Sequence, residues 1–203
     1  MWTDGTTAAK TIKWTIGRAI IAAVPAQNGT LTYDGNPKTP SWNTAYDSAK
    51  MTVSVTAATN AGTYSATFTP TSNYKWSDGS TGGKTASWTI GKAVNSVTNS
   101  PSSIMLKSSA KTATFTVNRK GNGTITATSN NTSVAKIKSI NQSTGVVTVE
   151  SVNDTTGTAK ITVKVAEGTN YKAASDTTVN VTATFVTIYG VESVSYTHLR
   201  AHE

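Results

Sequence analysis

Apolar and polar residues alternate along several short segments of the chain. Residues 51–56, 64–69 and 84–90 alternate in this way, and in the last of them Ala86, Trp88 and Ile90 fall on one side. Alternation with a period of two is typical of a β-strand that buries one face and exposes the other. The pattern therefore predicts three strands in this part of the chain.

The second half of the chain shows the same pattern in shorter, Val- and Thr-rich runs. It is clearest at residues 158–165, where apolar residues occupy every second position and lysines and threonines lie between them. Turn signals rich in Gly, Asn, Asp and Ser separate the runs. The predicted strands span residues 104–107, 112–117, 124–129, 134–140, 146–150, 158–165 and 177–185. Short strands joined by such turns indicate an all-β chain built of β-sandwiches.

An internal repeat sets the expected domain organisation. The stretch WTDGTTAAKTIKWTIGRA, residues 2–19, returns as WSDGSTGGKTASWTIGKA at residues 76–93. Repetition at a fixed period indicates tandem modules. We expect residues 1–18 to be the last strand or strands of a truncated preceding repeat, and residues 19–93 to be a complete module. A second module is expected at 94–186, and the start of a truncated further segment at 187–193.

The last ten residues, VSYTHLRAHE at 194–203, differ in composition from all that precedes them. Both histidines of the chain, His198 and His202, fall here. The string resembles a translated sequencing adapter, and such segments are excluded from reasoning about the fold. The alternative is a natural polar C-terminus. On the adapter interpretation the segment has no evolved partner surface.

Composition narrows the class of protein. Threonine is abundant, charged residues make up 14% of the chain and cysteine is absent. Threonine suits the solvent face of a strand, and the alternation argues against a disordered Thr-rich stalk. The net charge of +8 comes from lysines spread along the chain. Nucleic-acid binders cluster their basic residues, so no nucleic acid is expected as a partner. No apolar run is long enough to span a bilayer, so no membrane insertion is expected.

Several strings resemble known families. Residues 60–64, NAGTY, look like the approach to the tyrosine corner of immunoglobulin-like domains, with Ala66 where antibody domains carry a cysteine. With YDGNPKTP and NYKWSDGSTGGKTASWTIGKA, this stretch is similar to Ig-like repeats of bacterial surface proteins and tailed-phage virion proteins. ATSNNTSVAKI, STGVVTV and the run from residue 157 are similar to bacterial Ig-like domains of the group 2 type.

The resemblance implies tandem Ig-like β-sandwiches and an extracellular location, on a bacterial cell surface or a phage virion. It also implies a non-enzymatic role in spacing, display or adhesion. Expected partners are the neighbouring domains of a parent protein and a cell-surface glycan or protein ligand.

Candidate catalytic chemistry is sparse. Residues 1–193 contain neither Cys nor His, so thiol nucleophiles and imidazole bases are missing there. Asp4, Asp34 and Asp78 each precede a glycine and are predicted to cap turns. Asp34, Asn36 and Asp154 are candidate calcium ligands and residues 82–85 are a candidate phosphate loop, but neither set matches its motif. No catalytic, cofactor-binding or metal residue is predicted; a carboxylate pair assembled in space stays open.

The aromatic residues allow two hypotheses. If exposed, Trp42, Trp76 and their neighbours would suit the sugar-stacking platform of a carbohydrate-binding module. If buried, they would belong to a sandwich core, which is the interpretation favoured for Trp88; for Trp76 the sequence favours neither hypothesis. Tyr64 is expected to bond back to the nearby backbone. The second module has no Trp, so Phe115, Phe185 and Tyr171 are its predicted large core residues.

Overall fold

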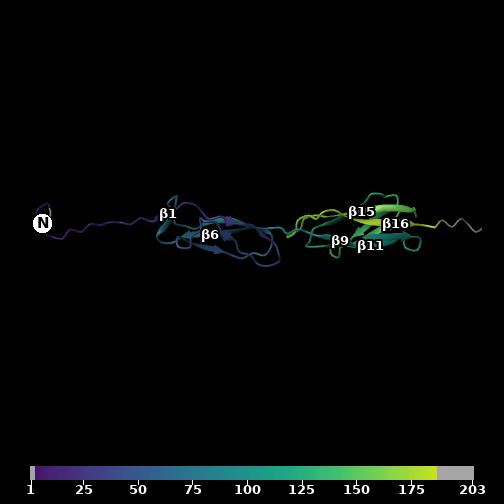
Figure 1. Cartoon of the computed structure of the whole chain (residues 1–203), viewed down its shortest axis with the longest axis horizontal. Helices are drawn as coiled ribbons and strands as arrows, with labels where there is room; N and C mark the ends of the chain where they lie inside the picture. The colour runs from purple at the N-terminus through teal and green to yellow at the C-terminus, as the bar shows by residue number, and fades with distance from the viewer. Residues whose placement is uncertain (1–2, 187–203) are drawn as a thin grey trace, which may run out of the picture. The chain divides into compact units, whose positions relative to one another are not determined.

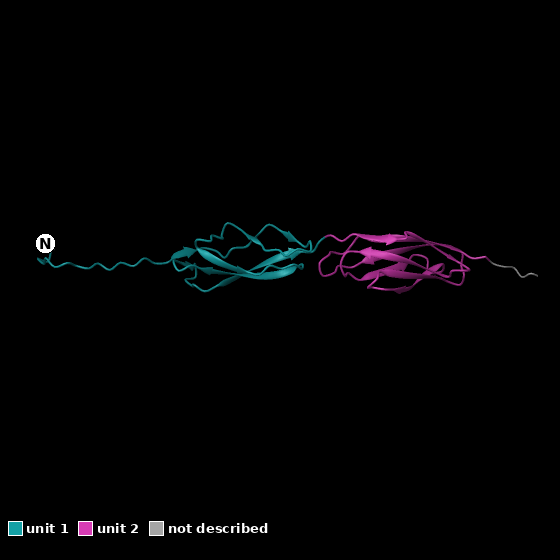
Figure 2. Ribbon diagram, turned by 90° about the horizontal axis from the view of Figure 1, so that it is seen from below, with its two compact units in different colours: residues 1–93 teal, residues 94–203 magenta. Residues whose placement is uncertain are grey.

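The computed structural model describes residues 3–186, and none of these residues lies in a helix. The predicted all-β class is therefore confirmed. The chain divides into two compact units, Met1–Ala93 and Val94–Glu203, which Figure 2 draws in teal and magenta. Each unit is described by itself below. The adapter-like residues 194–203 and residues 187–193 lie outside the described part.

Unit 1 contains eight strands, whose labelled members appear in the blue part of Figure 1. Its main sheet has the order β3-β8-β6-β5, and two smaller sheets pair β1 with β7 and β2 with β4. The strands are β1 (Ala19–Ile21), β2 (Gln27–Asn28), β3 (Leu31–Thr32), β4 (Ser41–Trp42), β5 (Met51–Val55), β6 (Gly62–Pro70), β7 (Tyr74–Trp76) and β8 (Lys84–Gly91).

The alternation in β8 has the predicted consequence. Trp88 and Ile90 are buried and Ala86 is half-buried, while the threonines and serine between them face solvent. β8 lies antiparallel to β6, with Trp88 opposite Tyr64 and Ile90 opposite Gly62. Its end pairs in parallel with the short β3, where Leu31 faces Ile90. β8 is thus held on both sides at its buried end.

A few large side chains form the core of unit 1. Trp76, Trp88, Phe68 and Met51 are the largest of the fully buried residues in this unit, each no more than 1% exposed. The indole of Trp88 packs 4.8 Å from the ring of Tyr64, measured between centroids. Burying such rings removes a large apolar area from water, so a small number of them can stabilise a small unit.

Two aromatic residues settle points that the sequence left open. Trp76 is buried, and its indole N–H donates a 2.8 Å hydrogen bond to the carbonyl oxygen of Gly82. Trp42 is half-buried and meets Phe68 edge-on at 4.8 Å. Both therefore contribute to the core of unit 1.

The predicted Tyr64 bond is present. The Tyr64 hydroxyl donates to the carbonyl oxygen of Asn60 at 2.7 Å. Gly62 lies between these residues, and a Cβ there would stand 3.4 Å from the Tyr64 hydroxyl oxygen. The Tyr64 ring thus lies back over the backbone at Gly62, at the start of β6, as the sequence predicts.

Residues 3–18 belong to unit 1 but form no strand, and Figure 1 draws them as a purple trace without arrows. Ile12, Trp14 and Ile16 are 80%, 76% and 78% exposed. These three residues alternate along the segment as Ala86, Trp88 and Ile90 do along β8. The segment therefore carries the apolar pattern of a buried strand without the burial.

Unit 2 is built of two four-stranded sheets, β10-β16-β15-β12 and β13-β14-β11-β9. Figure 1 shows β15 and β16 in one layer and β9 and β11 in the other. The strands are β9 (Val97–Ser100), β10 (Ser103–Lys107), β11 (Thr112–Arg119), β12 (Ile125–Ser129), β13 (Ala135–Ile140), β14 (Val146–Ser151), β15 (Gly157–Val165) and β16 (Thr177–Thr184). All seven predicted strands of this region are present, with ends within a residue or two.

The first sheet of unit 2 joins strands that are far apart in the sequence. β10 and β16 pair in parallel over five residues, from Ser103 opposite Asn180 to Lys107 opposite Thr184. The other neighbours in both sheets are antiparallel. A parallel pair needs a long connection, and here the rest of the sandwich supplies it.

Aliphatic side chains from both sheets share the core of unit 2. They include Leu106, Val147, Val149, Ile161 and Val179, all essentially inaccessible to solvent. The apolar side of β15 is buried at Ala159, Ile161, Val163 and Val165, as its alternation predicts. Two inner faces that meet in one core make this unit a β-sandwich.

The predicted aromatic core of unit 2 is correct for Phe115 and, at the margin of the core, for Phe185, but not for Tyr171. Phe115 is buried, and Phe185 is half-buried against the core. Tyr171 is half-buried and stands outside the core cluster, with its ring beside Gly121. Gly121 has a φ of 72°, and a Cβ there would meet the Tyr171 ring at 2.6 Å. Tyr171 thus covers a turn and does not fill the sandwich.

Each unit uses one glutamine amide in place of a strand neighbour. In unit 1, the Gln27 side chain accepts from the Thr89 N–H at 2.7 Å and donates to the Thr89 carbonyl at 3.1 Å. In unit 2, the Gln142 side chain accepts from the Ile125 N–H at 2.9 Å and donates to its carbonyl at 2.8 Å. An amide satisfies both backbone groups where no strand reaches them.

Candidate functional site

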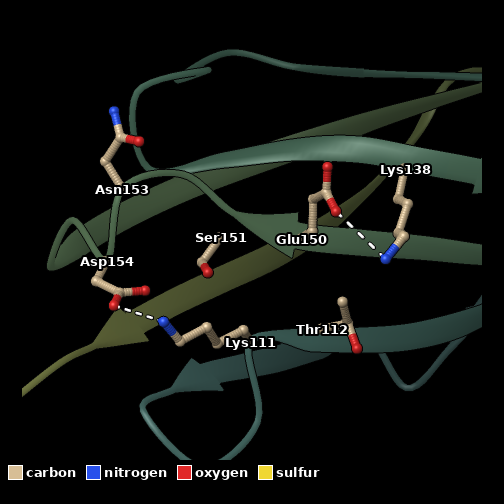
Figure 3. A pocket seen from close by; sticks show the side chains of 7 residues that line it. All are labelled: Lys111, Thr112, Lys138, Glu150, Ser151, Asn153 and Asp154. Carbon is tan, nitrogen blue, oxygen red and sulfur yellow. Dashed lines mark hydrogen bonds and ion pairs between the residues drawn. The ribbon is translucent and has the colours of Figure 1, made fainter.

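A polar hollow of about 580 Å³ opens on unit 2 where the end of β14 meets the start of β11 and the loop after β14 (Figure 3). Its walls carry charged and hydroxyl groups. The lining residues are Lys111, Thr112, Lys138, Glu150, Ser151, Asn153 and Asp154. None of them was predicted to form a site, because they come from four separate stretches of sequence.

The loop after β14 turns sharply at this hollow. Asn153 and Asp154 adopt φ values of 49° and 51°, in the left-handed region that Asn and Asp tolerate better than most residues. This turn brings the Asp154 carboxylate within 2.7 Å of the Lys111 ammonium, as the dashed line in Figure 3 marks. The ion pair joins the loop to the start of β11.

A second set of ion pairs spans β13 and β14. Lys136 lies 3.3 Å from Glu150 Oε1, and Lys138 lies 3.5 Å from Glu150 Oε2. The hydrogen bond from Lys136, with the charges of both lysines, lowers the pKa of the Glu150 carboxyl from its usual value. Glu150 is therefore ionised at neutral pH, a state that cannot donate a proton as a general acid.

The hollow is best described as a charge-balanced network. Both of its carboxylates face lysine ammonium groups at ion-pair distance. Among residues 3–186, no group of three or more His, Cys, Asp or Glu side chains stands close enough to hold a metal ion. The geometry thus explains how the loop and strands are held, and it assigns no reaction to the hollow.

The three aspartates predicted to cap turns do so. Asp4 accepts from the N–H of Thr6, Asp34 from that of Asn36, and Asp78 from that of Ser80. The glycine after each aspartate has φ between 79° and 90°. Asp34 also pairs with Lys38 at 2.8 Å. The Asp34 and Asn36 pair considered for calcium is thus a turn stabilised by a lysine.

The residues considered as a phosphate loop also have a structural role. Lys84, at the start of β8, pairs with Asp78 at 2.7 Å and lies 5.3 Å from the ring centre of Trp76. Its hydrogen bond, with those from Ser80, lowers the pKa of Asp78 well below its usual value. Lys84 thus ties the Asp-Gly turn to the strand that follows.

A sugar-stacking platform would need rings that face solvent together. In unit 1 the rings of Trp76, Trp88 and Phe68 are buried, and that of Trp42 packs on Phe68. Among the described residues, Trp14 is the one aromatic side chain found with the exposed large hydrophobics, beside Ile12 and Ile16. The tryptophans weighed for such a platform thus contribute mainly to the core.

The described residues include no helix with the length and apolar character that a bilayer crossing requires. No family model and no curated protein matches the chain. Solved structures of the surface layer protein SbsC are among those to which the chain is similar. For its domains 1–6 the identity is 19% and the TM-score 0.37, with 63% of this chain and 17% of that chain covered.

For SbsC domains 4–9 the identity is 19% and the TM-score 0.39, with 71% and 22% of the two chains covered. For its domains 4 and 5 the identity is 16% and the TM-score 0.39, with 80% and 96% covered. The chain thus spans less than a quarter of the two longer SbsC structures. A likeness of this degree assigns no function to the chain.

Proposed function

We propose that the chain is a non-enzymatic structural and display segment of a larger bacterial cell-surface or phage virion protein. Its two units would act as spacers that carry neighbouring domains outward and transmit tension between them. The parallel pairing of β10 with β16 in unit 2 is the observation that carries this proposal.

A parallel pair suits a protein under tension when one of its strands lies near the start of the unit and the other near the end. Once a pull on the two ends has drawn β9 away from β11, it moves β10 and β16 in opposite directions along their own axes. The bonds between them are then loaded together in shear, whereas a hairpin pulled apart at one end loses its bonds one at a time. The pair spans five residues and is backed by buried Ile104 and Leu106. Unit 2 is therefore built to resist extension.

The chemistry of the surface agrees with this role. The carboxylates of the polar hollow are paired with lysines, and the Asp-Gly turns hold local backbone. The alternative, a carbohydrate-binding module, would need a platform of exposed rings. The large rings of unit 1 instead supply its core. A structural segment thus accounts for more of the molecule than a glycan site does.

Pulling single molecules of the whole chain by its ends tests the proposal. We expect two unfolding steps, with unit 2 yielding at the higher force because its parallel pair is five residues long. In unit 1 the parallel pairs β1–β7 and β3–β8 span three and two residues. Unit 2 yielding at the lower force would contradict the proposal. Retention of the chain on bacterial polysaccharide, lost in Trp14→Ala, would favour the carbohydrate-binding alternative.

A further inference from the structure

Unit 1 contains two versions of one turn-and-strand sequence but a single place in its sheet for the strand. Residues 76–93 supply the version that folds as the end of β7, the Asp-Gly turn and β8. Residues 2–19 supply the other, with Lys10, Trp14 and Ile16 at the positions of Lys84, Trp88 and Ile90. One of the two strands is therefore surplus to this sheet.

The surplus copy already has the turn that precedes β8. Asp4 Oδ1 accepts from the N–H and hydroxyl of Thr6, as Asp78 Oδ1 accepts from the N–H and hydroxyl of Ser80. Lys10 pairs with Asp4, as Lys84 pairs with Asp78. The turn glycines have φ values of 79° and 84°. The turn forms without a sheet behind it, which reduces the ordering cost of docking the strand that follows.

The strand of the surplus copy has nothing comparable to cover it. Trp14 is 76% exposed where Trp88 is 1% exposed, and Ile16 is 78% exposed where Ile90 is 2% exposed. Ile12 replaces the half-buried Ala86 and is 80% exposed. An exposed apolar stripe with strand periodicity marks a surface that binds another protein.

The surplus strand cannot reach the β8 place in its own sheet. Ile90 pairs with Gly62 at one end of β6, whereas Ala19 is held near the other end, where its N–H donates to the Asn73 carbonyl. The nine residues of β6 span roughly 26 Å at the usual strand rise. The three residue steps from Ile16 to Ala19 reach only about 10 Å. A sheet that takes the strand at a place like that of β8 must therefore lie outside this unit.

A second copy of the chain is a poor acceptor. Its sheet already holds β8, and the surplus strand could enter only by displacing it. One Trp-bearing strand would then become exposed for each one that became buried. Ala9 stands at the position of Gly83, where a Cβ would meet Thr67 Cγ2 at 2.7 Å. Thr67 is β-branched and stiff, so it would not move aside easily. The surplus strand thus fits a sheet related to that of unit 1 but not identical to it.

We propose that residues 3–17 form a closing strand that docks on a separate β-sandwich of the unit 1 type. The acceptor sheet is open at the place that β8 takes in unit 1, and carries a residue smaller than threonine at the position of Thr67. Main-chain hydrogen bonds to the strands equivalent to β6 and β3 hold the segment, and Trp14 and Ile16 fill the acceptor core. This interaction is independent of the spacer role.

Grafting the surplus sequence into β8 of the full chain tests its fit. Ala86→Ile with Ser87→Lys turns TASWTI into TIKWTI, and we expect this variant to melt within a few degrees of the wild type. Gly83→Ala should lower the melting temperature of unit 1, and Thr67→Ala should restore it. Gly82→Ala is the matched control, because a Cβ there meets nothing within 4 Å, and it should cause the smaller change. Loss of the folded unit 1 in the double variant would overturn the proposal.

Docking itself is measured on a full-length acceptor that carries three substitutions. Thr67→Ala makes room for the Cβ of Ala9, Trp88→Ala weakens the acceptor's own β8, and Trp14→Ala removes its own surplus tryptophan. The probe is a synthetic peptide of residues 3–18. We expect the peptide to slow hydrogen exchange in β6, and its Trp14→Ala form to bind at least tenfold more weakly. A peptide of residues 77–92, which contains the natural β8 sequence, is the positive control. It remains the control if the acceptor folds only when a strand is supplied. Protection by the control peptide without protection by residues 3–18 would overturn the proposal.

Discussion

The two units close a β-sandwich in different ways. Unit 1 relies on a few large side chains, with Trp76, Trp88, Phe68 and Met51 at its centre and small two-stranded sheets around the main one. Unit 2 uses many aliphatic side chains, mostly Val and Ile, between two complete four-stranded sheets. Broad sheets can seal a core with small residues, whereas short strands need large rings to cover the same depth.

The difference sets where each unit is vulnerable. In unit 1 the Phe68 ring contacts both Trp42 of β4 and Tyr46 of the loop that follows, so the loss of one ring reaches several elements. In unit 2 the buried apolar surface is divided among many side chains, so backbone pairing at the edges matters more. The expected effects below test this contrast, from the largest to the smallest.

Trp88→Ala should have the largest effect and should be confined to unit 1. Truncating a buried ring of this size costs about 3–5 kcal/mol, which is a large share of the stability of a small unit. Calorimetry of the whole chain should show the unit 1 transition lost or shifted far down, with the unit 2 transition in place. Phe115→Ala is the matched change in unit 2, where aliphatic neighbours surround the ring. A shift of both transitions by either change would break the contrast.

Gln142→Ala should rank next. It leaves the N–H and carbonyl of the buried Ile125 without the amide that satisfies them, at a cost of about 1–3 kcal/mol. Gln27→Ala removes the equivalent bonds to Thr89, which faces solvent, so water replaces them and the cost should be smaller. Denaturant titration of each unit measures both. Equal losses would show that edge pairing matters alike in the two units.

Tyr64→Phe removes one hydroxyl and should cost about 1 kcal/mol in unit 1. The ring stays on Trp88, so only the bond to the Asn60 carbonyl is lost. The expected change is a small fall in the unit 1 melting temperature. A variant as stable as the wild type would show that this bond does not hold the start of β6.

The smallest effect concerns pH. Hydrogen bonds from Lys84 and Ser80 depress the pKa of Asp78, and Lys136 with Lys138 depresses that of Glu150. A carboxyl whose pKa is lower in the folded state stabilises the fold above its unfolded pKa. That contribution is lost as pH falls through the folded pKa. The melting temperature of each unit should therefore fall as the pH is lowered from 6 to 2. The fall should be smaller for unit 1 in Asp78→Asn and for unit 2 in Glu150→Gln. Unchanged pH profiles in both variants would contradict this account.

Much of the fold can be read from period-two patterns, because burial of one strand face dictates them. β8 and β15 follow their alternation closely. β2, β3 and β4 have two residues each, and what makes them strands is their partner across the fold, which no local pattern encodes. The Asp-Gly turns are local, so their caps could be predicted.

Features that depend on distant contacts could not be predicted. Tyr171 looked like a core residue by type, but the close approach of Gly121 gives its ring a place over a turn. The amide pairings of Gln27 and Gln142 depend on edge residues left without a strand neighbour. The polar hollow of unit 2 gathers residues from four stretches of the chain. Such placements follow from the assembled sheets and not from the sequence around each residue.

The pairing of β10 with β16 also has a consequence in time. The two strands begin at Ser103 and Thr177, so β10 is synthesised long before its partner. At about 5–20 residues per second, β10 waits roughly 4–15 seconds for β16 to be made. Unit 2 therefore cannot complete its first sheet until β16 has emerged. During that interval Ile104 and Leu106 lack the partner strand beside which they are buried in the finished unit.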